Sequence, residues 1–181
     1  NTNWKFLIEN FIEPYHVQFV HKTTTNQPLK DHYTIVDGIC YGSGVNVKQE
    51  DNKNANALSV SSKYLSLFPN FIIGSYYPNQ IGVYLNVPIS PSITSQKRII
   101  YTTDGTVMTK KESNITKKIW WNVHKEDHEI CERLQEGRFS PASNEGGLLS
   151  PYWEKGVQVF QKLIIQETMK SSKLVKGKKN V

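Results

Sequence analysis

The 181-residue sequence predicts a single α+β domain in which a mostly antiparallel sheet is covered by helices. Between residues 32 and 103, short runs of β-branched and aromatic residues alternate with turns, as in antiparallel strands. After Asp104-Gly105, the spacing of apolar residues changes from every second residue to about 3.6 residues, which is typical of amphipathic helices. The length is sufficient for one domain with a substantial core.

The predicted strands lie in three stretches of the chain. His32–Val47 contains β-branched and aromatic residues interrupted by Gly, as expected of strands with a turn or bulge. Leu65–Val87 is dense in apolar and aromatic residues and is expected to form antiparallel strands of the sheet core. Lys97–Thr103 is expected to add a short strand, whereas the Asn-rich segment Gln49–Ala57 is expected to be an exposed loop.

The remaining elements are predicted from apolar spacing. Ile115–Arg138 is expected to form one or two amphipathic helices that end at Gly137. Phe139–Ser150 is expected to be a Gly- and Ser-rich loop, and Pro151–Ser171 a long C-terminal helix. Near the N-terminus, Asn3–Phe11 alternates loosely and is predicted to be a strand.

The segment from Glu13 to His21 carries two imidazoles five positions apart behind a carboxylate, in apolar and aromatic surroundings. Pro14 favours a helix start there, with Glu13 beside the positive helix N-terminus. Five residues of a straight helix rotate by about 500°, which leaves His16 and His21 about 140° apart. Both therefore face one metal ion only if the helix ends or bulges near Val20; one core His and one surface His is the ordinary alternative.

Asp127 is the acid of interest on the second predicted helical stretch. It lies one turn from the apolar positions Val123, Ile130 and Cys131, so its carboxylate is expected to point inward. Periodicity alone explains a solvated or capping acid equally well. The other acids of the stretch are expected elsewhere on the helix: Glu126, Glu129 and Glu132.

Composition limits the class of protein. The net charge is +6, but removing five lysines near the C-terminus leaves +1, so a solvated tail is favoured over a nucleic-acid surface. No run approaches the ~20 apolar residues of a membrane span, so no membrane partner is expected. Cys40 and Cys131 are the only cysteines, which argues against a disulfide scaffold or an iron–sulfur cluster in these residues. A cytoplasmic location is expected.

Several short motifs occur in a fixed order along the chain. They are Asn3-Trp4-Lys5, Glu9-Asn10-Phe11, Glu13-x-Tyr15-His16, His21, Leu67-Phe68-Pro69-Asn70, Glu126-Asp127-x-x-x-Cys131-Glu132-x-x-Gln135, Leu149-Ser150-Pro151 and Gly156-Val157-x-x-Phe160-Gln161. This ordered set resembles the catalytic domain of the Rieske non-heme iron oxygenase α subunits over nearly the whole chain. The resemblance is strongest to the branch that acts on choline, betaine and carnitine.

The resemblance implies a helix-grip, START-like fold in which His16, His21 and Asp127 bind a mononuclear Fe(II). Two imidazoles and one carboxylate leave other iron positions open for O2 and substrate. Zinc accepts similar ligands, but the aromatic surroundings favour iron. The resemblance further implies catalytic roles for Glu13 and Asn10.

In that family the acid at the position of Glu13 links a ligand His to the Rieske cluster of a neighbouring subunit. Many aromatic dioxygenases carry Asp at this position, and a helix-capping role for Glu13 is equally compatible. Three apolar side chains are expected to form the wall of the substrate pocket: Phe11, Val17 and Val123.

Residues 1–181 are therefore expected to be the catalytic mononuclear-iron domain, with the 2Fe-2S cluster domain upstream of Asn1. Electrons would pass from NAD(P)H through a reductase or ferredoxin to the cluster, and then across a subunit boundary, which implies a homotrimer.

Three functions are compatible with the sequence. The first is hydroxylation or N-demethylation of a small organic substrate, the second is hydroxylation of an aromatic ring, and the third is a non-enzymatic START-like binding domain. A quaternary ammonium substrate would suit cation–π contacts with rings near the site, although the same rings also suit core packing. These rings are Tyr15, Phe19, Trp120, Trp121 and Tyr152.

Overall fold

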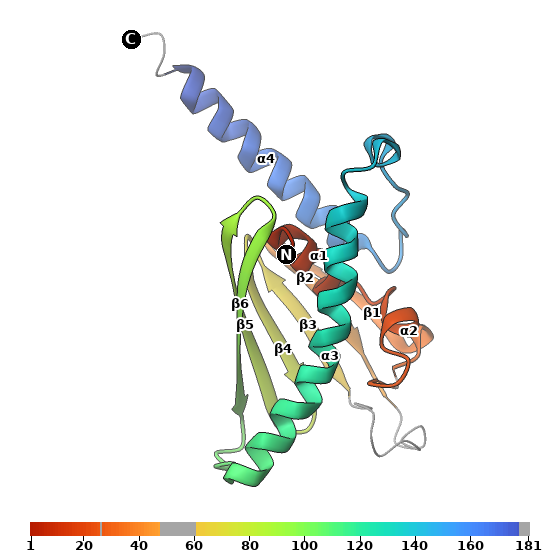
Figure 1. Cartoon of the computed structure of the whole chain (residues 1–181), viewed down its shortest axis with the longest axis vertical. Coiled ribbons are helices and arrows are strands. Elements are labelled where there is room, and N and C mark those ends of the chain that lie inside the picture. The colour runs from red at the N-terminus through yellow and green to blue at the C-terminus, as the bar shows by residue number, and fades with distance from the viewer. Residues whose placement is uncertain (26, 48–60, 178–181) are drawn as a thin grey trace.

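The computed structural model describes residues 1–25, 27–47 and 61–177 as one six-stranded antiparallel sheet with helices packed against it (Figure 1). Sequence neighbours are also neighbours in the sheet, in the order β1 to β6. The strands are β1 His32–Asp37, β2 Cys40–Val45, β3 Ser62–Leu67, β4 Phe71–Tyr76, β5 Gln80–Ser90 and β6 Ile93–Thr102. The expected α+β class and antiparallel sheet are confirmed. The predicted loop Gln49–Ala57 lies outside the described residues.

In the described residues four α-helices accompany the sheet: α1 Trp4–Ile12, α2 Val17–Val20, α3 Lys110–Gly137 and α4 Lys155–Gly177. The described connections also contain the short 3-10 helices Leu29–Asp31 and Pro141–Glu145. Helix α1 contacts strands of the sheet as well as α3 and α4, and the first part of α4 packs against β1 and β2. The C-terminal part of α4 extends away from the body of the molecule (Figure 1).

The predicted strand Asn3–Phe11 is wrong, because these residues form α1. The Asn3 side chain accepts a hydrogen bond from Lys5 N and caps the helix. Ile8 and Ile12 are both buried at the i, i+4 spacing of one helix face, whereas Asn10, which a strand would place on the same face as both, is not buried. A short apolar run does not distinguish the two periods clearly, and this ambiguity produced the error.

A helix beginning at Pro14 is also wrong. Residues 13–16 form a turn closed by Val17 N donating to Pro14 O (3.2 Å), and α2 spans only Val17–Val20. His16 and His21 are the two flanking residues of α2. The condition that the helix ends near Val20 is confirmed, so the 140° separation of a longer helix does not keep the imidazoles apart.

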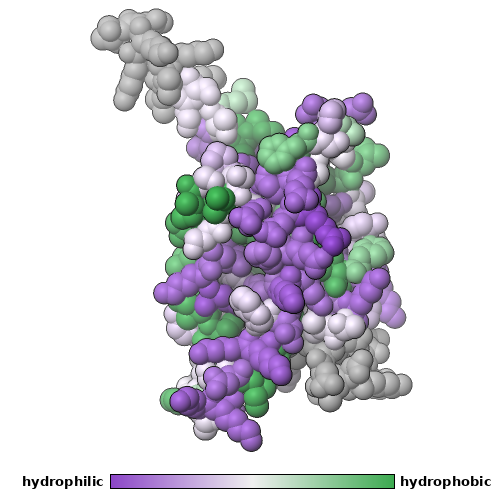
Figure 2. Space-filling model, viewed as in Figure 1, coloured by the Kyte–Doolittle hydropathy of each residue, from purple (hydrophilic) through white to green (hydrophobic). Residues whose placement is uncertain are grey.

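Helix α3 is one continuous helix rather than two and begins five residues before Ile115. Its start is fixed by a capping box between Thr109 and Glu112. Trp120, Val123 and Cys131 are its buried residues, whereas hydrophilic side chains lie over its outer face (Figure 2). The last predicted helix begins at Lys155 instead of Pro151.

Two groups of buried residues make up the core and meet at the functional site. One contains Tyr84 together with Ile8, Ile12, Tyr41, Ile72, Val157 and Phe160. The other contains Tyr76, Trp120 and Val123. Tyr84, Trp120 and Val123 line the same cavity, so the site lies between α3 and the inner face of the sheet.

Candidate metal centre and its pocket

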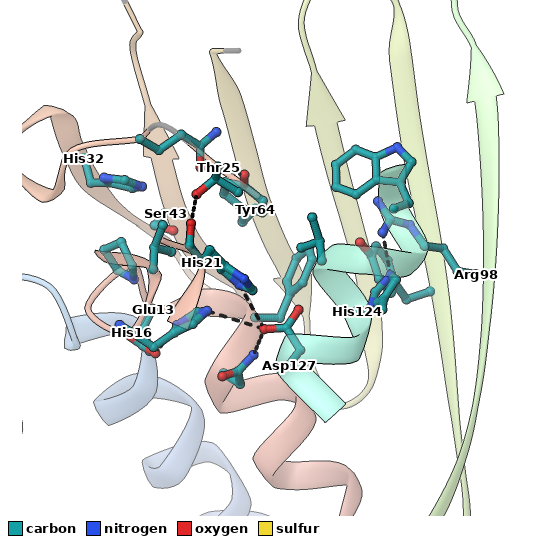
Figure 3. A pocket seen from close by; sticks show the side chains of 18 residues that line it. Glu13, His16, His21, Thr25, His32, Ser43, Tyr64, Arg98, His124 and Asp127 are labelled. Atoms are coloured by element: carbon teal, nitrogen blue, oxygen red, sulfur yellow. Dashed lines mark hydrogen bonds and ion pairs between the residues drawn. The ribbon is translucent and has the colours of Figure 1, made fainter. Parts of the chain in front are cut away.

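The turn before α2, the residue after it and the middle of α3 bring His16, His21 and Asp127 together (Figure 3). One donor atom of each side chain lies within 4.8 Å of the donor atoms of the other two. Asp127 Oδ1 is 3.1 Å from His21 Nε2 and 3.6 Å from His16 Nε2. The predicted inward direction of Asp127 is thus observed.

These distances fit a metal centre. Metal bonds to imidazole nitrogen and carboxylate oxygen are about 2 Å long, so adjacent ligands of one ion lie about 3 Å apart. Two imidazoles and one carboxylate are also the donor set that suits non-heme Fe(II) while leaving open positions. The residues present therefore fit a mononuclear iron.

Each imidazole has a carboxylate at its other nitrogen. Glu13 Oε1 lies 2.5 Å from His16 Nδ1, and Glu126 Oε2 lies 2.7 Å from His21 Nδ1. Glu126 also accepts a hydrogen bond from Thr24 Oγ1 (2.5 Å). A carboxylate at Nδ1 favours the tautomer with the proton on Nδ1, which directs the lone pair of Nε2 toward the metal position.

Glu13 also has a local structural role. Its second oxygen accepts hydrogen bonds from the backbone N–H groups of Tyr15 and His16. The same carboxylate therefore fixes the turn before α2 and contacts the His16 ring; its backbone partners precede α2, whose N-cap is His16, so Glu13 bonds the turn rather than capping the helix.

Asp127 is held as a carboxylate by its neighbours. Asn10 Nδ2 donates to Asp127 Oδ1 (2.9 Å). Burial raises the pKa of Asp127, but the hydrogen bond and charge of His21 and the contact with Asn10 outweigh it, and the pKa is lowered. For His21, burial lowers the pKa, while Asp127 and Glu126 raise it, and the net direction is upward.

A cavity of about 50 Å³ adjoins the three donor atoms. Phe11, Val17 and Val123, which the sequence predicted as pocket wall, all line it, and so do Asn10 and Glu13. The wall is completed by Pro14, by the segment after α2, by the sheet and by α3: Thr25, Gln27, His32, Ser43, Tyr64, Tyr84, Arg98, Trp120 and His124.

The end of the cavity beyond Asp127 contains a cation. The Arg98 guanidinium on β6 lies against the Trp120 ring, with 3.7 Å from Cζ to the ring centroid. Arg98 Nη1 is 2.5 Å from His124 Nε2, a residue on the same helix as Asp127 (Figure 3). Burial, followed by the charge of Arg98, lowers the pKa of His124 to about 4, so this imidazole is neutral at pH 7.

Most of the aromatic residues expected near the site do not line it. Of the five, only Trp120 lines the cavity. The other four are exposed: Tyr15, Phe19, Trp121 and Tyr152. For Trp121 the reason is its position, because adjacent residues of a helix point about 100° apart, and Trp120 takes the inward direction.

Several polar residues of the site were not predicted from the sequence, among them Glu126, Arg98 and His124. Glu126 was expected away from Asp127, yet it contacts His21 because α2 packs against α3 at the edge of the site. Arg98 directly follows Lys97 in β6, and strand alternation places these two cations on opposite faces of the sheet, so the local sequence does not mark which of them faces the cavity. His124 lies three residues before Asp127, and this helical spacing is also a usable signal.

Comparisons with known proteins agree with this geometry. Residues 1–170 match the family described as ring hydroxylating alpha subunit (catalytic domain). The choline monooxygenase of Atriplex hortensis is 28% identical over 160 residues, covering 88% of this chain and 36% of that protein. That of Spinacia oleracea is 26% identical over 176 residues, covering 93% of this chain and 38% of that protein. Both are described as chloroplastic. The chain spans little more than a third of these relatives.

Solved structures of the quaternary ammonium Rieske monooxygenase CntA share the fold. The complex with an inhibitor superposes with a TM-score of 0.72 at 18% identity and covers 91% of this chain and 45% of that chain. Another structure of a quaternary ammonium Rieske monooxygenase gives a TM-score of 0.69 at 20% identity, with 91% of this chain and 47% of that chain covered. This likeness agrees with the expected helix-grip fold. Among the described residues no helix has the length and apolar character needed to cross a bilayer; the cytoplasmic location stays a prediction.

Proposed function

Because the chain belongs to the ring hydroxylating alpha subunit family, as its catalytic domain, we propose that it is the oxygen-activating part of a Rieske-type oxygenase. The proposed reaction is hydroxylation or N-demethylation of a small organic substrate. The observation that carries it is the convergence of His16, His21 and Asp127 on one point beside a cavity. A binding domain that only holds a ligand has no need for this donor set.

In the proposed reaction His16 Nε2, His21 Nε2 and an Asp127 oxygen hold Fe(II). When bound, the ion supplies activation of O2 for insertion of oxygen into a C–H bond. Glu13 and Glu126 keep the two rings in the required tautomer and orientation. Asn10 donates to Asp127 and acts by positioning that carboxylate. The apolar wall of Phe11, Val17 and Val123 limits access of water to the reacting carbon.

The electrons come from outside this chain. We infer that a 2Fe-2S cluster domain belongs to the full-length protein, since the relatives are more than twice as long. One structure of a quaternary ammonium Rieske monooxygenase is described as giving insight into inter-subunit electron transfer. By analogy, Glu13 connects His16 to the cluster of a neighbouring subunit, in a homotrimer that receives electrons from NAD(P)H through a reductase or ferredoxin.

A quaternary ammonium compound is the proposed substrate class. The relatives are choline monooxygenases, and CntA has been solved with γ-butyrobetaine and with L-carnitine. Hydroxylation of an aromatic ring is the second candidate, favoured by the family description and by the ring-lined cavity.

The test uses the full-length protein with its reductase. We expect mononuclear iron in addition to the cluster iron, and NAD(P)H oxidation coupled to oxidation of choline, γ-butyrobetaine or L-carnitine. A panel of small aromatic compounds, assayed in parallel, distinguishes the second candidate. Protein that contains only cluster iron and oxidises none of these compounds would contradict the proposal.

A further inference from the structure

The aromatic rings at the far end of the cavity already hold a cation. Arg98 is the cross-strand partner of Tyr84, so both side chains lie on the same face of the sheet. Its Cζ is 3.7 Å from the ring centroid of Trp120, 4.5 Å from that of Tyr84 and 5.6 Å from that of Tyr76. These are cation–π contacts, and they take the faces that a trimethylammonium group would otherwise use.

In the part of the chain that the structure describes, the hydrogen-bond partners of the Arg98 guanidinium are neutral. Nη1 contacts the neutral His124 (2.5 Å), and Nη2 donates to Tyr76 Oη (3.2 Å). A guanidinium has five N–H groups, so three remain without an acceptor among the residues that the structure describes. One of them, on Nε, is buried. Within the same residues, no carboxylate forms an ion pair with Arg98.

The acids of the site are engaged elsewhere. Glu13 and Glu126 each face an imidazole nitrogen, and Asp127 is held between His21 and Asn10. Arg98 is therefore a half-buried cation, fixed by ring stacking, that lines the substrate cavity with unused donors. A planar guanidinium with free N–H groups matches a carboxylate, which it binds with two parallel hydrogen bonds.

Arg98 lies in the same cavity as the proposed metal ligands and contacts the helix that carries one of them. His124, which contacts Arg98, and Asp127 are three residues apart on α3, a rise of about 4.5 Å along the helix axis. Arg98 and Asp127 line the same cavity, so a ligand held at Arg98 lies in the cavity that adjoins the metal ligands.

We propose that Arg98 binds a carboxylate of the substrate, so that the pocket selects a short carboxylate-bearing ammonium compound over a simple ammonium cation. This inference rests on the proposed function and narrows its substrate class. Choline is a simple cation without an anionic group. It therefore gains no attraction from the positive charge of Arg98, which would attract a carboxylate at the same position.

The experiment compares binding of choline, glycine betaine and γ-butyrobetaine to the iron-loaded full-length protein by calorimetry. Glycine betaine carries a carboxylate where choline carries a hydroxymethyl group. We expect at least one of the two carboxylates to bind at least ~10-fold more tightly than choline. In Arg98→Gln that preference falls by ~10- to 100-fold, the range for hydrogen bonds to a charged group, while choline is not weakened.

Two further variants control the result. Lys97→Gln removes the same charge from the next residue of β6, which is exposed and points to the opposite face of the sheet, so it should leave the preference unchanged. Arg98→Lys keeps the charge but loses the planar fork, and should retain part of the preference. If Arg98→Gln does not fold, the proposal is tested by the preference of the wild type for the carboxylates over choline and by the change of that preference in Arg98→Lys.

Choline binding to the wild type as tightly as both carboxylates would overturn the proposal. So would an unchanged preference in Arg98→Gln, or tighter choline binding with unaltered carboxylate binding, because the guanidinium would then only fill an ammonium site. Iron content and turnover are measured on the same samples. Loss of oxidation with the carboxylate preference intact counts against the proposed function alone.

Discussion

The two ends of the cavity differ in whether their charged groups have charged or polar partners. At the metal end, the imidazoles of His16 and His21 face the carboxylates of Glu13 and Glu126, and Asp127 is held by polar contacts. At the other end, Arg98 has rings and neutral acceptors around it. Groups whose hydrogen bonds are complete hold a fixed geometry, which suits ligands of a metal. A cation with unused donors has capacity to bind an external anion.

The largest expected effect comes from the three proposed ligands. His16→Ala, His21→Ala and Asp127→Ala should each lose mononuclear iron and reduce turnover by more than the ~100-fold that loss of an outer partner costs. The fold should survive, because the site is local to one turn and one helix. Metal analysis measures the iron content, and circular dichroism checks that the fold survives.

Glu129→Ala on the exposed face of α3 is the matched control for Asp127→Ala and should keep its iron. Full iron occupancy in Asp127→Ala would remove that residue from the ligand set. Glu126, whose carboxylate is 2.7 Å from His21 Nδ1, would then become the next candidate.

The next effect separates the two carboxylate–histidine pairs. Glu13→Gln and Glu126→Gln should each lower turnover by ~10- to 100-fold. Glu126→Gln is expected to weaken iron binding, because Glu126 supports the buried His21. Glu13→Gln is expected to keep iron and substrate affinity but to slow single-turnover oxidation of the cluster.

The outcomes for Glu13→Gln are distinguished by measuring the rate of cluster oxidation and the iron content in the same preparation. Lost iron would make Glu13 a structural support for His16. Normal cluster oxidation would leave it as the acid that fixes the turn before α2.

The smallest effect concerns pH and the Arg98 end. The folded pKa of His124 is lowered to about 4 by burial and by Arg98, below the 6.5 of an ordinary His. Between pH 6.5 and 4 the unfolded chain binds a proton that folded His124 does not. The stability from neutral His124 is thus present above pH 6.5 and is lost as the pH falls toward 4, by an amount on the order of 1–3 kcal/mol.

His124→Gln keeps an acceptor for Arg98 without the titration. Denaturant unfolding at pH 7 and pH 5 should show a smaller loss of stability in this variant than in the wild type. The exposed His128→Gln, one turn further along α3, should behave like the wild type. Equal losses in His124→Gln and the wild type would contradict the assigned pKa direction.

The sequence predicted those parts of the molecule that depend on local pattern. The strands followed from alternation, and His16, His21 and Asp127 from short motifs. The α1 helix was missed because a short apolar segment fits two periods. Glu126 and Arg98 were missed because their neighbours are set by how α2, β6 and α3 pack, which no single segment encodes. His124 was missed although its helical spacing to Asp127 is a local signal.

The most direct test of the metal site is an anomalous difference map at the iron edge from iron-loaded crystals of the full-length protein. Besides the cluster iron, we predict one peak per chain, about 2 Å from His16 Nε2, His21 Nε2 and an Asp127 oxygen. The carboxylates of Glu13 and Glu126 should still be hydrogen-bonded to Nδ1 of His16 and of His21. A peak bound by Glu126 instead of Asp127, or cluster iron without a peak between the two imidazoles, would contradict the account.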